Sequence, residues 1–155
     1  MLDELYTKDV LRQAAMISRT GQLDAPDATA KRVSPVCGSR ISVDLCMKDG
    51  VVTDYAQDIH ACALGQSSAS ILAAGIIGKT PDDLANVAQQ MRRMLLDDGS
   101  PPNEPWDNFA ILESVRDHKA RHGAVMLALE ATLDAAAQIT GQTYLQPADA
   151  LTKAG

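Results

Sequence analysis

The chain has few aromatic residues, no excess of basic residues and no long apolar run. Aromatic residues make up only 3% of its 155 residues, so its core has to be built from Leu, Ile, Val, Met and Ala. The net charge is −6 and the basic residues are scattered. This disfavours nucleic acid and anionic membranes as partners, because phosphate binding needs clustered Lys and Arg. No window approaches the roughly 18 apolar residues of a membrane span.

Cysteine is also scarce. Cys37, Cys46 and Cys62 are an odd number of thiols in a chain large enough to fold without disulfides, which favours free thiols in a reducing compartment. The first residues, MLDELYTKDVLRQAAM, are interrupted by charge and lack the apolar stretch of a secretory signal. We therefore expect a cytoplasmic protein without a disulfide framework.

The rest of the composition fits a folded chain. Hydrophobic residues make up 46% and charged residues 22%, which argues against disorder. A length of 155 residues fits one domain, and we expect residues 1–155 to form it. The tail after the last predicted helix, residues 141–155, is expected to be flexible.

Alternation of apolar and polar residues marks a small sheet. The segment ISVDLCMK, at 41–48, is typical of a half-buried strand. Asp49-Gly50 favours a two-residue hairpin turn, after which 51–59 returns as the partner strand. A short strand is expected near 29–34.

Apolar residues at helical spacing predict the remaining elements. Helices are expected over 3–19, 64–78, 80–96, 106–116 and 118–140. Thr80, Pro81 and Asp83 form a helix start with the composition of a capping box. The order of elements predicts an α+β domain in which helices cover one face of an antiparallel sheet.

The predicted hairpin brings two thiols together. Cys37 precedes its first strand and Cys62 follows its second, so both lie near the open end of the hairpin. Cys62 also stands at a helix start, where the helix dipole favours thiolate over thiol. Two buried structural cysteines are the alternative, because free Cys is among the most buried residue types. We interpret Cys46, on the polar face of its strand, as structural or incidental.

Several segments carry a resemblance to a known family. They are PVCGSR at 35–40, the hairpin through DGVVTDYAQDI, HACALGQSSASIL at 60–72, GKTPDDL at 78–84 and KARHGAVMLALEA at 119–131. In this order they resemble the IscU/SufU/NifU N-terminal family of iron–sulfur cluster assembly scaffolds, from about residue 5 to residue 139.

The resemblance implies both a fold and a function. It implies an α+β fold with a three-stranded sheet, and cluster assembly or zinc-dependent sulfur acceptance without enzymatic turnover. The partners it implies are a cysteine desulfurase as sulfur donor and cluster-accepting proteins. By motif, Cys37 matches the family's first ligand and Cys62 its second, and the bound species would be an iron–sulfur cluster, iron or zinc.

The sequence departs from the family at two expected ligands. Ser39 stands in place of an aspartate, and the third cysteine falls at Ala124, or at Gly123 with a one-residue shift. A closed zinc or cluster site takes four ligands, so Cys37 and Cys62 leave this one incomplete.

Histidines are the candidates for the missing ligands. His122 lies two residues before the lost cysteine and is the candidate third metal ligand; His118 lies four residues earlier on the same helix face. His60, two residues before Cys62, is a further candidate. The alternative for each histidine is an ordinary solvated position.

Three functions remain open from the sequence. The first is a cluster scaffold or carrier whose site is completed by His122, an external thiol or a second protomer in a homo-oligomer. The second is a sulfur relay, in which Cys62 or Cys37 accepts a persulfide from a desulfurase. The third is a degenerate interaction module that binds no metal.

Overall fold

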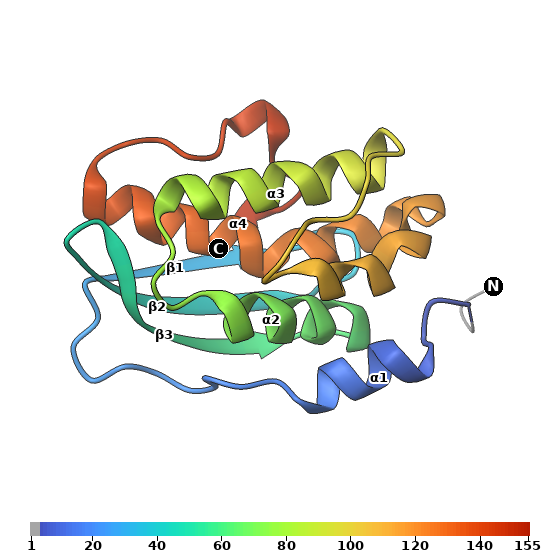
Figure 1. Cartoon of the computed structure of the whole chain (residues 1–155), viewed down its shortest axis with the longest axis horizontal. Coiled ribbons are helices and arrows are strands. Elements are labelled where there is room, and N and C mark those ends of the chain that lie inside the picture. Colours follow the sequence, from blue (N-terminus) through green and yellow to red (C-terminus); the bar gives the residue numbers. More distant parts are fainter. Residues whose placement is uncertain (1–3) are drawn as a thin grey trace.

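The computed structural model describes residues 4–155 (Figure 1). Its helices are α1 (Lys8–Ala15), α2 (Ala63–Gly75), α3 (Pro81–Leu96) and α4 (His122–Thr140), with 3₁₀ segments η2 (Asp107–Asp117), η3 (Lys119–Arg121) and η4 (Pro147–Asp149). Its strands are β1 (Ala28–Val33), β2 (Arg40–Lys48), β3 (Val51–His60) and β4 (Lys153–Ala154). No helix within residues 4–155 is long and apolar enough to cross a membrane.

The sheet is antiparallel, with the strand order β3-β2-β1-β4. The predicted hairpin is confirmed: β2 and β3 pair from Lys48 and Val51 at the turn to Arg40 and His60 at the open end. Asp49 and Gly50 both have positive φ angles, 54° and 82°, which is the conformation that a two-residue hairpin turn requires. The predicted short strand is also confirmed as β1.

Helices cover one face of the sheet, as Figure 1 shows. Ile41, Val43 and Leu45 of β2 are buried on this face, where α4 packs across β1 and β2. Helix α2 packs beside α4, α1 packs on α2, and α3 packs on α4. The α+β prediction with helices on one face is confirmed, but the sheet has four strands instead of the three implied by the family resemblance.

Most predicted helices are present, but with different ends. The predicted helix over 3–19 is shorter, spanning only Lys8–Ala15, and residue 3 lies outside the described range. Helix α3 begins at the predicted capping box, in which the side chains of Thr80 and Asp83 each accept from the other's backbone N–H.

The segment predicted as a helix over 106–116 is wound as a 3₁₀ helix. Its buried side chains are Trp106, Phe109, Leu112 and Val115. They recur every third residue, and a helix with three residues per turn places such a series on one side. The winding therefore follows the spacing of the buried residues.

The segment 141–155, for which the sequence predicts flexibility, follows a defined path in the structure. Gly141 ends α4 with a φ of 78°, and the chain then runs back along α4 to the sheet. There Lys153 and Ala154 pair with Val33 and Arg32 as the added strand β4. The tail is held because a buried carboxylate binds its backbone.

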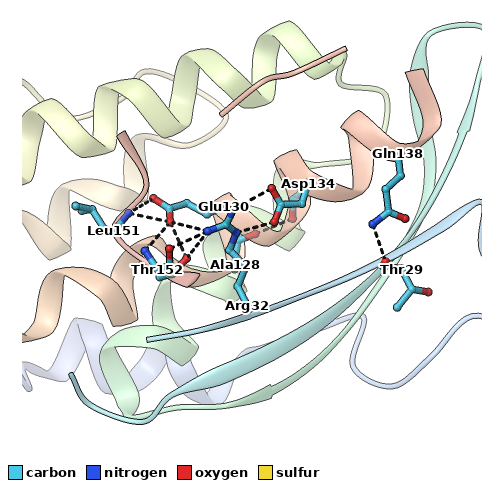
Figure 2. A network of polar contacts seen from close by, with 9 residues as sticks. Thr29, Arg32, Ala128, Glu130, Asp134, Gln138, Leu151 and Thr152 are labelled. Atoms are coloured by element: carbon cyan, nitrogen blue, oxygen red, sulfur yellow. Dashed lines mark hydrogen bonds and ion pairs between the residues drawn. The ribbon is translucent and has the colours of Figure 1, made fainter. Parts of the chain in front are cut away.

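That carboxylate belongs to Glu130 of α4, which is fully buried (Figure 2). It accepts from Thr152 N at 2.9 Å, from Thr152 Oγ1 at 2.6 Å and from Leu151 N at 3.0 Å. Arg32 of β1 forms a two-point ion pair with Asp134, at 2.6 and 3.1 Å, and donates to the Thr152 carbonyl at 2.8 Å. The network therefore ties together β1, α4 and the tail.

Burial raises the pKa of Glu130, although the hydrogen bonds from Thr152 and Leu151 and the charge of Arg32 oppose the rise. The folded protein thus binds this proton more tightly than the unfolded chain. The resulting stability is fully present below the unfolded-state pKa and is lost as pH rises through the folded-state pKa.

We predict that the stability advantage of wild type over Glu130→Gln shrinks as pH rises from the ordinary carboxyl range toward neutrality. The glutamine does not titrate, and all other groups are shared, so the difference isolates Glu130. Urea unfolding of both proteins across this pH range measures it. An advantage that grows with pH would show instead that Arg32 stabilises the ionised carboxylate more than burial destabilises it.

Candidate functional site

The two predicted site cysteines lie at the open end of the hairpin. Arg40 and His60 are the last paired residues of β2 and β3, and Cys37 and Cys62 lie just outside this pair. The hydroxyl of Tyr6, which precedes α1, hydrogen bonds with the Cys62 side chain and lies within electrostatic range of Cys37. Both thiols are partly exposed and free.

Cys37 sits in a tight loop between β1 and β2. Ser34 N donates to the Ser39 carbonyl and Gly38 N donates to the Ser34 carbonyl, both at 2.8 Å. Gly38 has a φ of 74°, a conformation that disfavours other residues. The Cys37 thiol donates to Ser39 Oγ at 3.2 Å, and Ser34 is almost completely buried beneath the loop.

This environment favours the ionised thiol. Partial burial acts to raise the pKa of Cys37, but hydrogen bonds from Ser34 and Ser39 and the charge of Arg121 outweigh it, so the pKa is lowered. Burial, followed by the neighbouring Cys62, raises the pKa of Tyr6, which keeps its phenol protonated as a donor. The site therefore combines an acidified thiol, a second thiol, a phenol and a guanidinium.

Cys62 is the N-cap residue of α2, as the sequence predicts. Within the described chain its thiol makes no capping hydrogen bond to the helix, so the sulfur is not used to hold the helix start. The small residues behind it allow close packing: a Cβ atom at Gly65 would come within 3.2 Å of the Ala124 carbonyl oxygen on α4. The first turns of α2 and α4 are therefore in contact beside Cys62.

The position of the family's third cysteine is also at this junction. Ala124 lies in the first turn of α4 and is buried, as is Gly123. The structure thus places Ala124, one of the two positions expected for that cysteine, next to the start of α2, and neither Ala124 nor Gly123 has a side chain that can ligate a metal.

The predicted histidines are placed differently from one another. His122 is buried, and its Nε2 lies 3.0 Å from the Val115 carbonyl and 3.1 Å from that of Arg116. Two carbonyl acceptors require a protonated Nε2, which leaves Nδ1 for any metal. His60 is exposed and lies 3.4 Å from Asp58, and His118 follows η2. Metal binding by His122 stays a prediction.

The arrangement offers two partly exposed thiols. Within residues 4–155, no group of three His, Cys, Asp or Glu side chains is placed to hold a metal ion. Cys46 lies elsewhere, with its thiol 3.5 Å from the Ala25 carbonyl. The structure adds Tyr6, Ser34 and Arg121 to the site, and no motif in the sequence identified them. Tyr6 and Arg121 reach the thiols through tertiary packing, and Ser34 does so through the closure of the Cys37 loop.

Comparison with known proteins gives one matching family and several similar proteins. The family model of the NifU-like N terminal domain matches residues 5–122. The solved structure of a nitrogen-fixing NifU-like protein (N-terminal) from Brucella abortus is 42% identical, with a TM-score of 0.88 over 92% of this chain and 99% of that one.

Two more distant relatives also match most of this chain. The iron–sulfur cluster assembly scaffold protein IscU of Thermotoga maritima is 23% identical over 136 residues, 88% of this chain and 95% of that protein. A putative scaffold protein for the SUF system from Fervidobacterium islandicum has the same fold, with 15% identity and a TM-score of 0.77 over 85% of this chain and 96% of that one.

We predict that Ser39→Ala raises the pKa of Cys37, because the thiolate loses a hydroxyl donor. The pH profile for alkylation of Cys37 by iodoacetamide, followed by mass spectrometry, should shift to higher pH and the rate at neutral pH should fall. Labelling of Cys46 in the same molecule is the internal control. An unchanged Cys37 profile would mean that the Ser34 hydroxyl, the Ser39 backbone and Arg121 set its acidity without the Ser39 hydroxyl.

We predict that His122→Ala lowers the free energy of unfolding by about 1–3 kcal/mol, because the carbonyls of Val115 and Arg116 lose their donor. Bound metal should remain if the ring serves only this structural role. Chemical denaturation and metal analysis of the same samples measure both effects. A variant that folds normally and loses its metal would instead assign a ligand role to Nδ1.

Proposed function

Because the chain belongs to the NifU-like N-terminal domain family, we propose that it acts as a scaffold or carrier in iron–sulfur cluster assembly. It would bind and transfer its cargo and not turn over a substrate. The proposal includes a cysteine desulfurase and cluster-accepting proteins as partners, a cytoplasmic location, and one domain over residues 1–155.

The observation that supports this proposal most is the pairing of Cys37 and Cys62 around Tyr6 at one end of the hairpin. Thiolates are the usual protein ligands of iron–sulfur clusters and bind zinc equally well. We propose Cys37 and Cys62 as the ligands of the cargo, whether that is a nascent cluster, iron or zinc. The lowered pKa of Cys37 favours the thiolate that such binding needs.

The remaining ligands would come from elsewhere. A cluster bound by two protein thiolates keeps further positions open, because four ligands normally complete it. The candidates are an external thiol, the thiols of a second protomer, or Nδ1 of His122. Open positions suit a carrier, since an acceptor's thiolates can enter before the donor's leave.

A sulfur relay is the second candidate, and the acidified Cys37 favours it. The Cys37 thiolate would attack the outer sulfur of a desulfurase persulfide, forming a new S–S bond as the old one breaks. The desulfurase cysteine would leave as a thiolate, and Cys37 would carry the persulfide. This transfer needs no metal and no additional oxidant or reductant. A degenerate interaction module without either chemistry is the third candidate.

We predict near-stoichiometric iron or zinc in protein purified without oxygen, with loss of the metal in both Cys37→Ser and Cys62→Ser. Cys46→Ser is the matched control and should retain it, because Cys46 lies apart from the site. Metal analysis and circular dichroism of all four proteins measure binding and folding together.

Metal-free wild type, with the variants equally folded, would contradict the scaffold proposal. Mass spectrometry after incubation with a desulfurase and cysteine then separates the alternatives. One added sulfur on Cys37 or Cys62 would favour the relay, and unmodified thiols would leave the interaction module.

A further inference from the structure

The network around Glu130 joins the tail to the strand that leads into the Cys37 loop. Figure 2 shows Arg32 lying between Asp134 of α4 and the tail residue Thr152. Arg32 is the next-to-last residue of β1, and the loop that carries Cys37 begins after Val33. The end of β1 is therefore bound to α4 through Arg32 and paired with β4 at the edge of the sheet.

A second set of contacts brings the tail and the loop to the same residue of α4. At Gly123, in the first turn of α4, an added Cβ atom would overlap Ser34 Oγ and lie 3.4 Å from the Leu151 carbonyl oxygen. Ser34, Gly123 and Leu151 therefore meet at a point where only glycine fits on the helix. They also line a common pocket of about 300 Å³ beside Val36, the residue before Cys37.

Ser34 is hydrogen bonded within the Cys37 loop and also lies against Gly123. Its backbone makes both hydrogen bonds that close the loop, and its hydroxyl hydrogen bonds with the Cys37 side chain. Any movement of Ser34 thus changes the loop closure and the thiol's partner together. On its other side Ser34 is confined by Gly123 and by the tail, which Glu130 holds in place.

We propose that residues 147–155 act as a strap that positions the Cys37 loop, with Glu130 and Thr152 as its anchor. Glu130 and Thr152 are positioning residues: they act through the Leu151 backbone and Ser34, and neither contacts Cys37. With the anchor intact, Ser34 is held in place and Cys37 stays near Tyr6, as Cys62 does. With the anchor broken, the tail leaves Gly123 and the loop loses its support. The link to cargo binding rests on the proposed function, but the link between tail and loop does not.

A pair of matched threonine variants tests the strap in the full-length protein. Thr152→Val removes the hydroxyl that donates to Glu130 at 2.6 Å. Thr132→Val removes a similarly buried hydroxyl on α4, which bonds to Ala128 and Tyr55 and touches neither tail nor loop. Hydrogen–deuterium exchange of peptides covering residues 34–39 is the main measurement, because the amides of Ser34 and Gly38 close the loop.

Thr152→Val should speed exchange of these loop amides about tenfold, and Thr132→Val should leave it at the wild-type rate after correction for global stability. Equal protection of the loop in both variants would overturn the strap. If Thr152→Val fails to fold, Gly123→Ala replaces it in the experiment. The added methyl group displaces Ser34 from the side of α4. It should speed exchange of the loop amides while the amides of residues 151 and 152 stay protected. Unchanged loop exchange in that variant would likewise overturn the proposal.

Zinc affinity, measured by competition with a chelator, tests whether the strap affects metal binding by Cys37 and Cys62. Thr152→Val should weaken it about tenfold relative to Thr132→Val, because Cys37 is no longer held in place. If wild type binds neither zinc nor iron, the scaffold proposal is contradicted while the exchange result still decides the strap. Equal zinc affinity in the two variants, despite faster loop exchange, would overturn the positioning role.

Discussion

The register of the β2–β3 hairpin is the constraint on which the site depends. A strand buried on one face tolerates no shift by a single residue, since every side chain would move to the opposite face. Ile41, Val43 and Leu45 are all buried under the helices, so the register is set by the core. The pairing of Arg40 with His60 follows from it, and with that pairing the approach of Cys37 and Cys62. The site is thus positioned by hydrophobic burial some distance from its own sulfur atoms.

Much of this could be predicted because it depends on local signals. Strand alternation, the Asp49-Gly50 turn and the capping box at Thr80 each involve residues close in sequence, and all three are confirmed. The 3₁₀ winding of η2 was missed because the prediction over 106–116 rested on apolar residues at helical spacing and did not separate a period of three residues from one of 3.6. The ordered tail was missed because its partner, Glu130, lies about 20 residues away and resembles an ordinary charged residue in a helix.

The candidate site was predictable only in part, for a related reason. Cys37 and Cys62 are joined by the topology of a single hairpin, which the sequence reveals. Tyr6 and Arg121 come from the segments before α1 and α4, and no periodicity relates them to the thiols. They depend on how helices pack on the sheet, and this packing is set by the shapes of many side chains at once. His122 shows the opposite problem, because a residue type suited to metals is used here to satisfy two backbone carbonyls.

The departures from the family's ligand pattern and the surroundings of Cys37 are physically consistent with each other. An aspartate and a third thiolate would add negative charge beside Cys37 and Cys62, and a thiolate among like charges is disfavoured. Here Ser39 donates a hydrogen bond without adding charge, Ala124 is neutral, and Arg121 supplies a positive charge. The absence of these negative charges and the presence of Arg121 both lower the cost of ionising Cys37. These neighbours favour the ionised form of Cys37, which is the form that the proposed ligand role requires.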